Sequence, residues 1–150
     1  MEVKIIPYEP VHAYDILERN IRECDVQLTG YPDWEQWVEN WKTGGPAYTL
    51  VIDGQIVGCA GVMLLKWGRG EAWTLLSGLL YQYPKTCFKA VRDGLKGIIR
   101  DEGLTRVQAL VRPDFEEGKR FMSHLGFKEE GILAAYGPGG EDVIMFGRVP

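Results

Sequence analysis

The chain has 150 residues, a length that predicts one domain with a single hydrophobic core. Hydrophobic residues make up 45% and charged residues 25%, a balance typical of globular proteins that excludes a disordered or fibrous chain. The formal net charge of -4 gives no general attraction to nucleic acids or anionic membranes, so neither is expected as a partner.

Targeting and metal-binding signals are weak. No stretch has the apolar length of a membrane span, and the opening "MEVKIIPYEP" lacks the basic and apolar regions of a signal peptide. A cytoplasmic location is therefore expected. Cys24, Cys59 and Cys87 are an odd number without a C-x-x-C pair, which favours buried free thiols over disulfides or a zinc site. The two histidines lie far apart in the sequence, and no metal site is expected.

The first third of the chain is predicted to form one strand and two helices. A strand at "VKIIPYEP" is followed by a helix over residues 11–24, where apolar residues recur at helical spacing. A second helix starts after "GYPD" and ends at the glycines after "WKT". Trp34, Trp37 and Trp41 lie on one face of this helix. A core-facing stripe is favoured over an aromatic ligand site.

The remaining two thirds begin as β-structure and then alternate. Asp53-Gly54, between two apolar runs, predicts a β-hairpin, and "AWTLLSGLLY" predicts a third strand. A helix over residues 84–102 precedes a strand at "TRVQALVRP". The next helix has Asp114 as its expected cap and ends at Gly126. Two strands around "GPGGE" finish the chain. The order β-α-α-β-β-β-α-β-α-β-β predicts an α/β layer arrangement with a mixed sheet.

This order, with "GKRFMSHLGFKEEGIL" and "GGEDVIMFGRV", resembles the GCN5-related N-acetyltransferase (GNAT) family. The resemblance implies an α/β fold over residues 1–150, a mixed central β-sheet with splayed strands flanked by helices, as in acyl-CoA N-acyltransferases. It also implies acetyl-CoA or CoA as the cofactor, bound where two central strands part. Gly126 suits the left-handed backbone that ends a helix, while Leu125 and Phe127 return to the core on either side.

The resemblance also implies where the cofactor binds. The family cradles the coenzyme's pyrophosphate with a (Gln/Arg)-x-x-Gly-x-(Gly/Ala) motif, and the matching stretch here is "QYPKTC". Gln82 fits the motif, whereas Lys85 and Cys87 replace the two small residues; Lys85 offers an ammonium group to a phosphate instead. Phe115 and Met122 stand where the family often has an Asn and a Tyr that acts as an acid. The implied cofactor-binding residues are Leu76, Ser77, Gln82, Lys85, Thr86, Phe115 and Met122.

Acetyl transfer to an amine needs a neutral amine, a donor for the developing oxyanion and an acid for the departing thiolate. Glu71 is a candidate catalytic residue, because related enzymes often keep a carboxylate at this position; a solvated turn residue is the favoured alternative. Ser77 and Tyr81 are candidates where the strand should part from its neighbour, with strand-end polar residues as the alternative. His124 is expected to be an exposed helix-end residue, and Tyr136 is a further candidate acid.

The helix over residues 84–102 also carries a basic ridge opposite its apolar stripe. A solvated face is the favoured interpretation. A seat for the coenzyme's 3′-phosphate and contact with an acidic partner are the alternatives. The ridge consists of Lys85, Lys89, Arg92, Lys96 and Arg100.

Two hypotheses of function follow from these observations. The first is an N-acyltransferase acting on an amine of a small molecule or a protein, with its acceptor site covered by the first two helices and with Tyr31 and Trp34 near the rim. The second is a non-catalytic relative, because phage-encoded proteins similar to the family show comparable "WTLLS" and "RVQALV" blocks without the glycine-rich loop. Such a virion, morphogenesis or interaction protein would have phage structural proteins as partners. A homodimer is left open in both.

Overall fold

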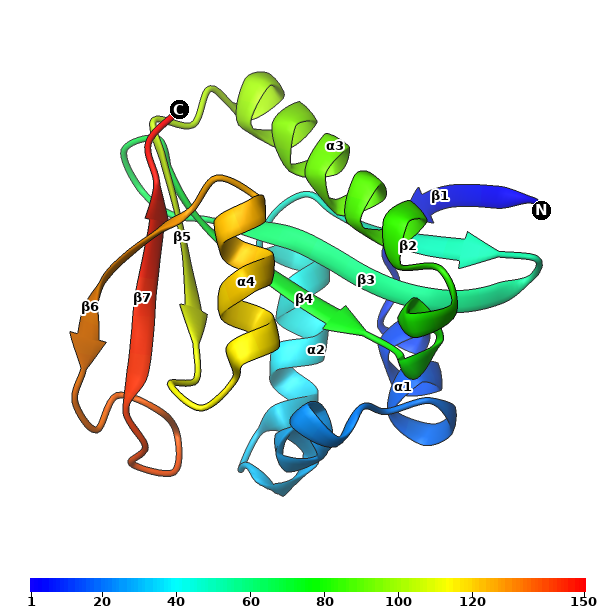
Figure 1. The fold of residues 1–150 in the computed structure, drawn as a ribbon, viewed down its shortest axis with the longest axis horizontal. Helices are drawn as coiled ribbons and strands as arrows, with labels where there is room; N and C mark the ends of the chain where they lie inside the picture. Colours follow the sequence, from blue (N-terminus) through cyan, green and yellow to red (C-terminus); the bar gives the residue numbers. More distant parts are fainter.

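The computed structural model describes the backbone of residues 1–150 and all side chains except those of Glu23, Val26 and Gln27. Its elements follow the predicted order (Figure 1). The strands are β1 (Val3–Pro7), β2 (Ala47–Ile52), β3 (Gln55–Leu64), β4 (Arg69–Leu76), β5 (Arg106–Val111), β6 (Lys128–Leu133) and β7 (Val143–Arg148). The α-helices are α1 (Pro10–Arg19), α2 (Trp34–Thr43), α3 (Pro84–Glu102) and α4 (Glu116–His124). Two 3₁₀ helices, η1 (Glu23–Gly30) and η2 (Gly78–Gln82), were not predicted.

The strands form one mixed sheet in the order β1-β2-β3-β4-β5-β7-β6. Neighbouring strands are antiparallel except for β4 and β5, which run parallel. The β2–β3 hairpin turns at Asp53 and Gly54, whose φ angles of 48° and 78° suit a tight two-residue turn between twisted strands. Figure 1 shows α3 and α4 on one face of the sheet and α1 and α2 on the other. The predicted fold class is confirmed.

Both faces of the sheet bury a core, and β4 contributes to each by alternation. Leu76 packs with α3, whereas Leu75 belongs to the cluster formed with α1 and α2. Val38 of α2 is fully buried, and Trp34 and Trp41 pack against the same cluster. The tryptophan face of α2 is therefore largely core-facing, as predicted.

Two predicted boundaries are wrong, and each has a local cause. The first helix ends at Arg19, because the next residue, Asn20, leaves the helical conformation and its carbonyl accepts the Gly78 N–H at 2.8 Å. The cap of α4 is Phe115 and not Asp114, whose exposed carboxylate lies 3.9 Å from Arg112 instead. Both corrections shorten helices whose interiors were predicted correctly.

The end of α4 agrees with the sequence analysis. Gly126 has a φ of +90°, a conformation that glycine adopts at low cost. Leu125 and Phe127 on either side are 4% and 3% exposed. This turn fixes where β6 begins.

Candidate active site

The central feature of the sheet is a gap between β4 and β5. The two strands pair only from Arg69–Arg106 to Glu71–Gln108. Beyond this point β4 stays on β3 and β5 stays on β7, so the two strands diverge. The splayed pair implied by the sequence resemblance is therefore present.

Backbone polar groups of β4 face this gap. Ser77 at the end of β4 donates its N–H to the Val57 carbonyl at 2.9 Å, so its backbone faces the β3 side. Because neighbouring residues of a strand direct their N–H and C=O groups to opposite edges, those of Thr74 and Leu76 face the gap. No strand pairs with them there, and a buried backbone group needs a partner. An extended ligand with amide groups would supply one.

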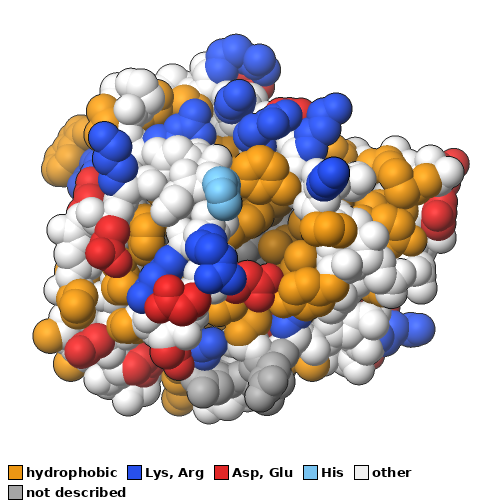
Figure 2. Space-filling view, in the orientation of Figure 1, with side chains coloured by type: hydrophobic (Ala, Val, Ile, Leu, Met, Phe, Trp, Pro, Cys, Tyr) orange, Lys and Arg blue, Asp and Glu red, His pale blue; other side chains and the backbone are white. Residues whose placement is uncertain are grey.

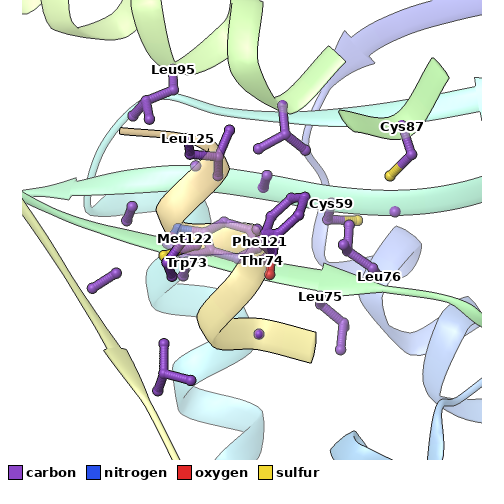
Figure 3. Close-up of a pocket in the computed structure, with 18 of the residues that line it drawn as sticks. Cys59, Trp73, Thr74, Leu75, Leu76, Cys87, Leu95, Phe121, Met122 and Leu125 are labelled. Atoms are coloured by element: carbon purple, nitrogen blue, oxygen red, sulfur yellow. The ribbon is translucent and has the colours of Figure 1, made fainter. Parts of the chain in front are cut away.

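A cavity of about 750 Å³ passes through the sheet at the gap. This volume is within the range of small-molecule and cofactor sites. Figure 3 shows the cavity between α3, α4 and the central strands, with Cys87 and Leu95 of α3 and Phe121 and Met122 of α4 among the residues around it. Its lining on the α3/α4 side includes Cys87, Val91, Leu95, Phe121 and Met122, and on the α1/α2 side Tyr31, Trp37, Trp41 and Trp73.

The mouth on the α3/α4 side is apolar with a basic edge. Figure 2 shows hydrophobic side chains around a hollow in this face, with Lys and Arg side chains beside it. Phe88 of α3 and Phe121 of α4 meet edge to face across the hollow, with ring centroids 5.9 Å apart. Of the predicted basic ridge on α3, only Arg92 is half-buried and the other four residues are exposed. The ridge is thus solvated along most of its length.

The three candidate catalytic residues lie in different surroundings. Glu71 is half-buried in β4, lines the cavity and accepts a hydrogen bond from the Gln108 side chain at 3.2 Å. Ser77 is fully buried, and its hydroxyl accepts the Leu79 N–H at 3.1 Å as the cap of η2. Tyr81 is exposed and donates to Glu117 at 3.0 Å. Only Glu71 is among the residues that line the cavity.

His124 and Tyr136, the other two residues considered in the sequence analysis, also lie in different surroundings. His124 is exposed, as expected, and borders the cavity with its ring 6.3 Å from that of Phe88. Tyr136 lies in the β6–β7 loop, 58% exposed and outside the cavity lining. Of the two residues expected at the acceptor rim, Tyr31 lines the cavity, whereas Trp34 packs on Tyr14 with ring centroids 5.9 Å apart.

The predicted cofactor-binding residues fall into two groups. Leu76, Phe115 and Met122 line the cavity. Gln82, Lys85, Thr86 and Ser77 do not, because the first three lie at the junction of η2 and α3. Lys85 is the second residue of α3 and has no positive φ, so the motif position that glycine usually occupies does not require one here. The start of α3 presents the backbone N–H groups of a helix N-terminus.

The sequence analysis missed a polar cluster at the open end of the gap. Arg22, with 8% of its side chain exposed, lies 3.2 Å from Asp25 and 3.8 Å from Glu117, and its guanidinium stands 5.7 Å from the centre of the Phe115 ring. Burial raises the pKa of Asp25, although Arg22 opposes this shift. Arg22 and Asp25 flank or lie in η1, which has no periodic signal in the sequence. The cluster ties this segment to α4.

The sequence analysis also missed a contact between Tyr31 and the β6–β7 loop, on the α1/α2 side of the cavity. The Tyr31 hydroxyl donates to Glu141 of the β6–β7 loop at 2.9 Å, which raises the pKa of Tyr31. Backbone N–H groups and this hydroxyl lower the pKa of Glu141. The Tyr31 ring also lies close to Gly139, so the loop and the start of α2 form one wall.

The cysteines are not suited to nucleophilic roles. Burial raises the pKa of Cys59 to about 12 and that of Cys87 to about 11, so both thiols stay protonated near neutral pH. Burial also raises the pKa of half-buried Cys24. No group of three or more metal-ligating side chains occurs among the described residues. No helix in the described part of the chain has the length and apolar character to cross a bilayer.

No family model matches the sequence, and no curated protein matches it. The fold, in contrast, matches many solved structures. Ard1 from Thermoplasma volcanium superposes with a TM-score of 0.78 at 16% identity, over 99% of this chain and 98% of that one. A spermidine N-acetyltransferase SpeG chimera from Vibrio cholerae and hSSAT gives 0.76 at 12% identity, over 99% and 96%. A GNAT-family acetyltransferase from Bacillus anthracis gives 0.72 at 16% identity, over 99% and 95%.

These TM-scores, over nearly the whole chain, establish the fold. The chain has the fold of the GNAT acetyltransferases, with the mixed sheet and the diverging central strands that the sequence resemblance implied.

Proposed function

We propose that this protein is an N-acyltransferase that transfers the acetyl group of acetyl-CoA to an amine. The observation that carries the proposal is the cavity that passes through the sheet between β4 and β5. Such a passage lets a donor enter from the α3/α4 side and an acceptor from the α1/α2 side, so that the two meet in the gap. Holding both reactants in one geometry is a large part of the catalysis of group transfer.

The α3/α4 side has the chemistry to hold a coenzyme A molecule. The N–H and C=O groups of Thr74 and Leu76 face the gap and match the amides of an extended pantetheine arm. Phe121 and Met122 supply an apolar wall for that arm. The N-terminus of α3, with the ammonium of Lys85, suits the phosphates.

Glu71 is the proposed proton acceptor of the amine, directly or through water. It is the last residue of β4 that is paired with β5, so its carboxylate lies at the vertex of the gap, held by Gln108. The N–H of Thr74 is the proposed donor to the developing oxyanion. Bound acetyl-CoA supplies the activated thioester.

The departing thiolate has no tyrosine beside it in the expected place. Met122 occupies that position in the cavity and has no proton to donate. A thiol with a pKa near 8.5 is a good leaving group at neutral pH, and we assign its proton to water that enters from the α3/α4 side. This assignment predicts a modest rate of transfer.

Isothermal titration with CoA tests the proposal, together with an assay of thiol release from acetyl-CoA in the presence of amines. Thr74→Phe fills the gap and is expected to abolish CoA binding, whereas the similarly shaped Thr74→Val keeps the backbone and is expected to bind. Circular dichroism of both variants checks their folding. Absence of binding to the wild type at millimolar CoA would rule the function out.

The virion-protein alternative has no support from the neighbours named above, each of which is an acetyltransferase. The fold alone does not decide activity. Incorporation of the protein into phage particles together with absence of CoA binding would favour that alternative.

A further inference from the structure

The α1/α2 side of the cavity is walled by aromatic rings. Trp41 and Trp73 stack with ring centroids 4.3 Å apart and an interplanar angle of 10°. Tyr31 and Trp37 lie 5.8 Å apart at 41°. All four line the cavity, from η1, α2 and β4. Flat aromatic surfaces bind planar apolar groups and bring several favourable contacts at low entropic cost.

One polar atom of this wall has no partner. Among the described side chains, Trp73 Nε1 is the only buried side-chain nitrogen or oxygen without a hydrogen bond. An unpaired buried donor is costly, and ordinary proteins contain few. The ring of Trp73 lines the cavity, but this nitrogen is fully buried, so a bound molecule would reach it only if neighbouring side chains moved.

The charges on this side favour a single ammonium group. Glu71 lies two residues before Trp73 on β4, so both side chains project from the same face of the sheet. Its carboxylate accepts a hydrogen bond from the neutral Gln108 amide, and none of the ion pairs among the described side chains includes it. The other carboxylates that line this side, Glu141 and Asp25, already face Arg112 and Arg22. Glu71 is therefore the carboxylate of this side that is left to pair with an ammonium group.

We infer that the acceptor is a primary amine carried by a short arm on an aromatic ring. The ammonium group pairs with Glu71, and the ring lies against Trp37 and the Trp41–Trp73 stack. The inference rests on the proposed N-acyltransferase function and names the substrate class of that same site.

Equilibrium binding without any acyl donor tests the inference apart from catalysis. The probes are 2-phenylethylamine, n-hexylamine and spermidine, followed by tryptophan fluorescence. We expect 2-phenylethylamine to bind about five-fold more tightly than n-hexylamine, because aromatic contacts of this kind add roughly 1 kcal/mol. Equal affinity for the two monoamines, or tighter binding of spermidine, would overturn the inference. Neither result bears on CoA binding, so the CoA titration tests the proposed function separately.

Two variants test which part of the protein causes the preference for 2-phenylethylamine. Trp37→Leu, at a half-buried position of the wall, is expected to remove most of the preference for 2-phenylethylamine. Trp67→Leu is the matched control, because Trp67 is 82% exposed in the β3–β4 turn and lies outside the cavity lining. In the wild-type protein, the indole ¹⁵N–¹H resonance of Trp73 should shift on adding 2-phenylethylamine while that of Trp67 does not. An unchanged Trp73 resonance would contradict the placement of the acceptor.

Discussion

At the scale of single residues, Glu71 combines a position at the start of the gap with a carboxylate that can accept a proton. Its strand partner is the last before the gap, and its carboxylate lies on the acceptor side. Glu71→Gln keeps the shape and removes the base, so kcat/KM for the amine should fall about 100-fold at neutral pH. The dissociation constant for CoA, measured by titration, should stay unchanged. Glu129→Gln, at an exposed position of β6, is the control. Full activity of Glu71→Gln would remove the carboxylate from the mechanism.

Arg22 should matter more for stability than its surface neighbours. Arg22→Met removes the nearest cation of half-buried Asp25, which should lower the free energy of unfolding by about 3 kcal/mol at pH 7 in urea titrations. Exposed Arg19 pairs with Asp15 at 2.9 Å, and Arg19→Met should cost less than about 1 kcal/mol.

The loss of unfolding free energy in Arg22→Met should become smaller as the pH falls. Burial already raises the pKa of Asp25 in the folded protein, and removal of Arg22 raises it further. A carboxyl with a raised folded pKa binds its proton more tightly when folded, so the variant should regain stability as pH falls through that folded pKa. Urea midpoints of variant and wild type should therefore converge as the pH is lowered from 7. A constant difference would show that Asp25 stays ionised.

Residue-level prediction succeeded where a side chain's direction follows from a regular element. Leu76 and Met122 were placed in the site through strand and helix positions, and both line the cavity. Ser77 and Tyr81 lie outside the cavity lining, because a hydroxyl after the end of a strand is as readily used to cap the next turn or to bind a neighbour. Arg22 had no signal, since two of its partners, Glu117 and Phe115, are distant in sequence and Asp25 lies in a segment without helical or strand periodicity.

At the scale of elements, periodicity decided what was predictable. The bounds of α3 agree with the prediction, because Pro84 starts the helix and Gly103 ends it around an apolar stripe. The segments η1 and η2 were missed, because short 3₁₀ turns follow neither the helical nor the strand period. The early end of α1 depends on Asn20 and Gly78, a contact that no local pattern records.

Alanine substitutions at Gly103, which caps the end of α3, and at Gly97, inside α3, should change the free energy of unfolding in opposite directions. Gly103 has a φ of 62°, so Gly103→Ala should lower the free energy of unfolding by about 1 kcal/mol. Gly97 is inside the helix, and a Cβ there would come no closer than 3.7 Å to Arg100, so Gly97→Ala should raise it by roughly 0.5 to 1 kcal/mol. Denaturant titration of both variants tests this; changes of the same sign would contradict the helix assignment at one of them.

At the scale of the whole molecule, the proposed function depends on a break in the pairing of an otherwise continuous sheet. The sequence predicted the strands and a mixed sheet, but the cavity through the sheet arises from pairing that stops at Glu71 and Gln108. Nothing in the sequence of β4 marks that stop, since Ala72 to Leu76 have ordinary strand character. Only the resemblance implied it, whereas the aromatic wall came from packing between α2 and β4.

The two-sided cavity predicts that donor and acceptor bind together without competition. At a concentration 100 times its dissociation constant, a ligand raises the free energy of unfolding by about 2.7 kcal/mol, or roughly 5 to 10 °C in Tm for a chain of this size. CoA and 2-phenylethylamine added together should therefore give at least the sum of their separate shifts in calorimetry. Thr74→Phe should lose the shift from CoA and keep that from the amine. A combined shift no larger than the greater single one would mean that both ligands occupy one side of the sheet.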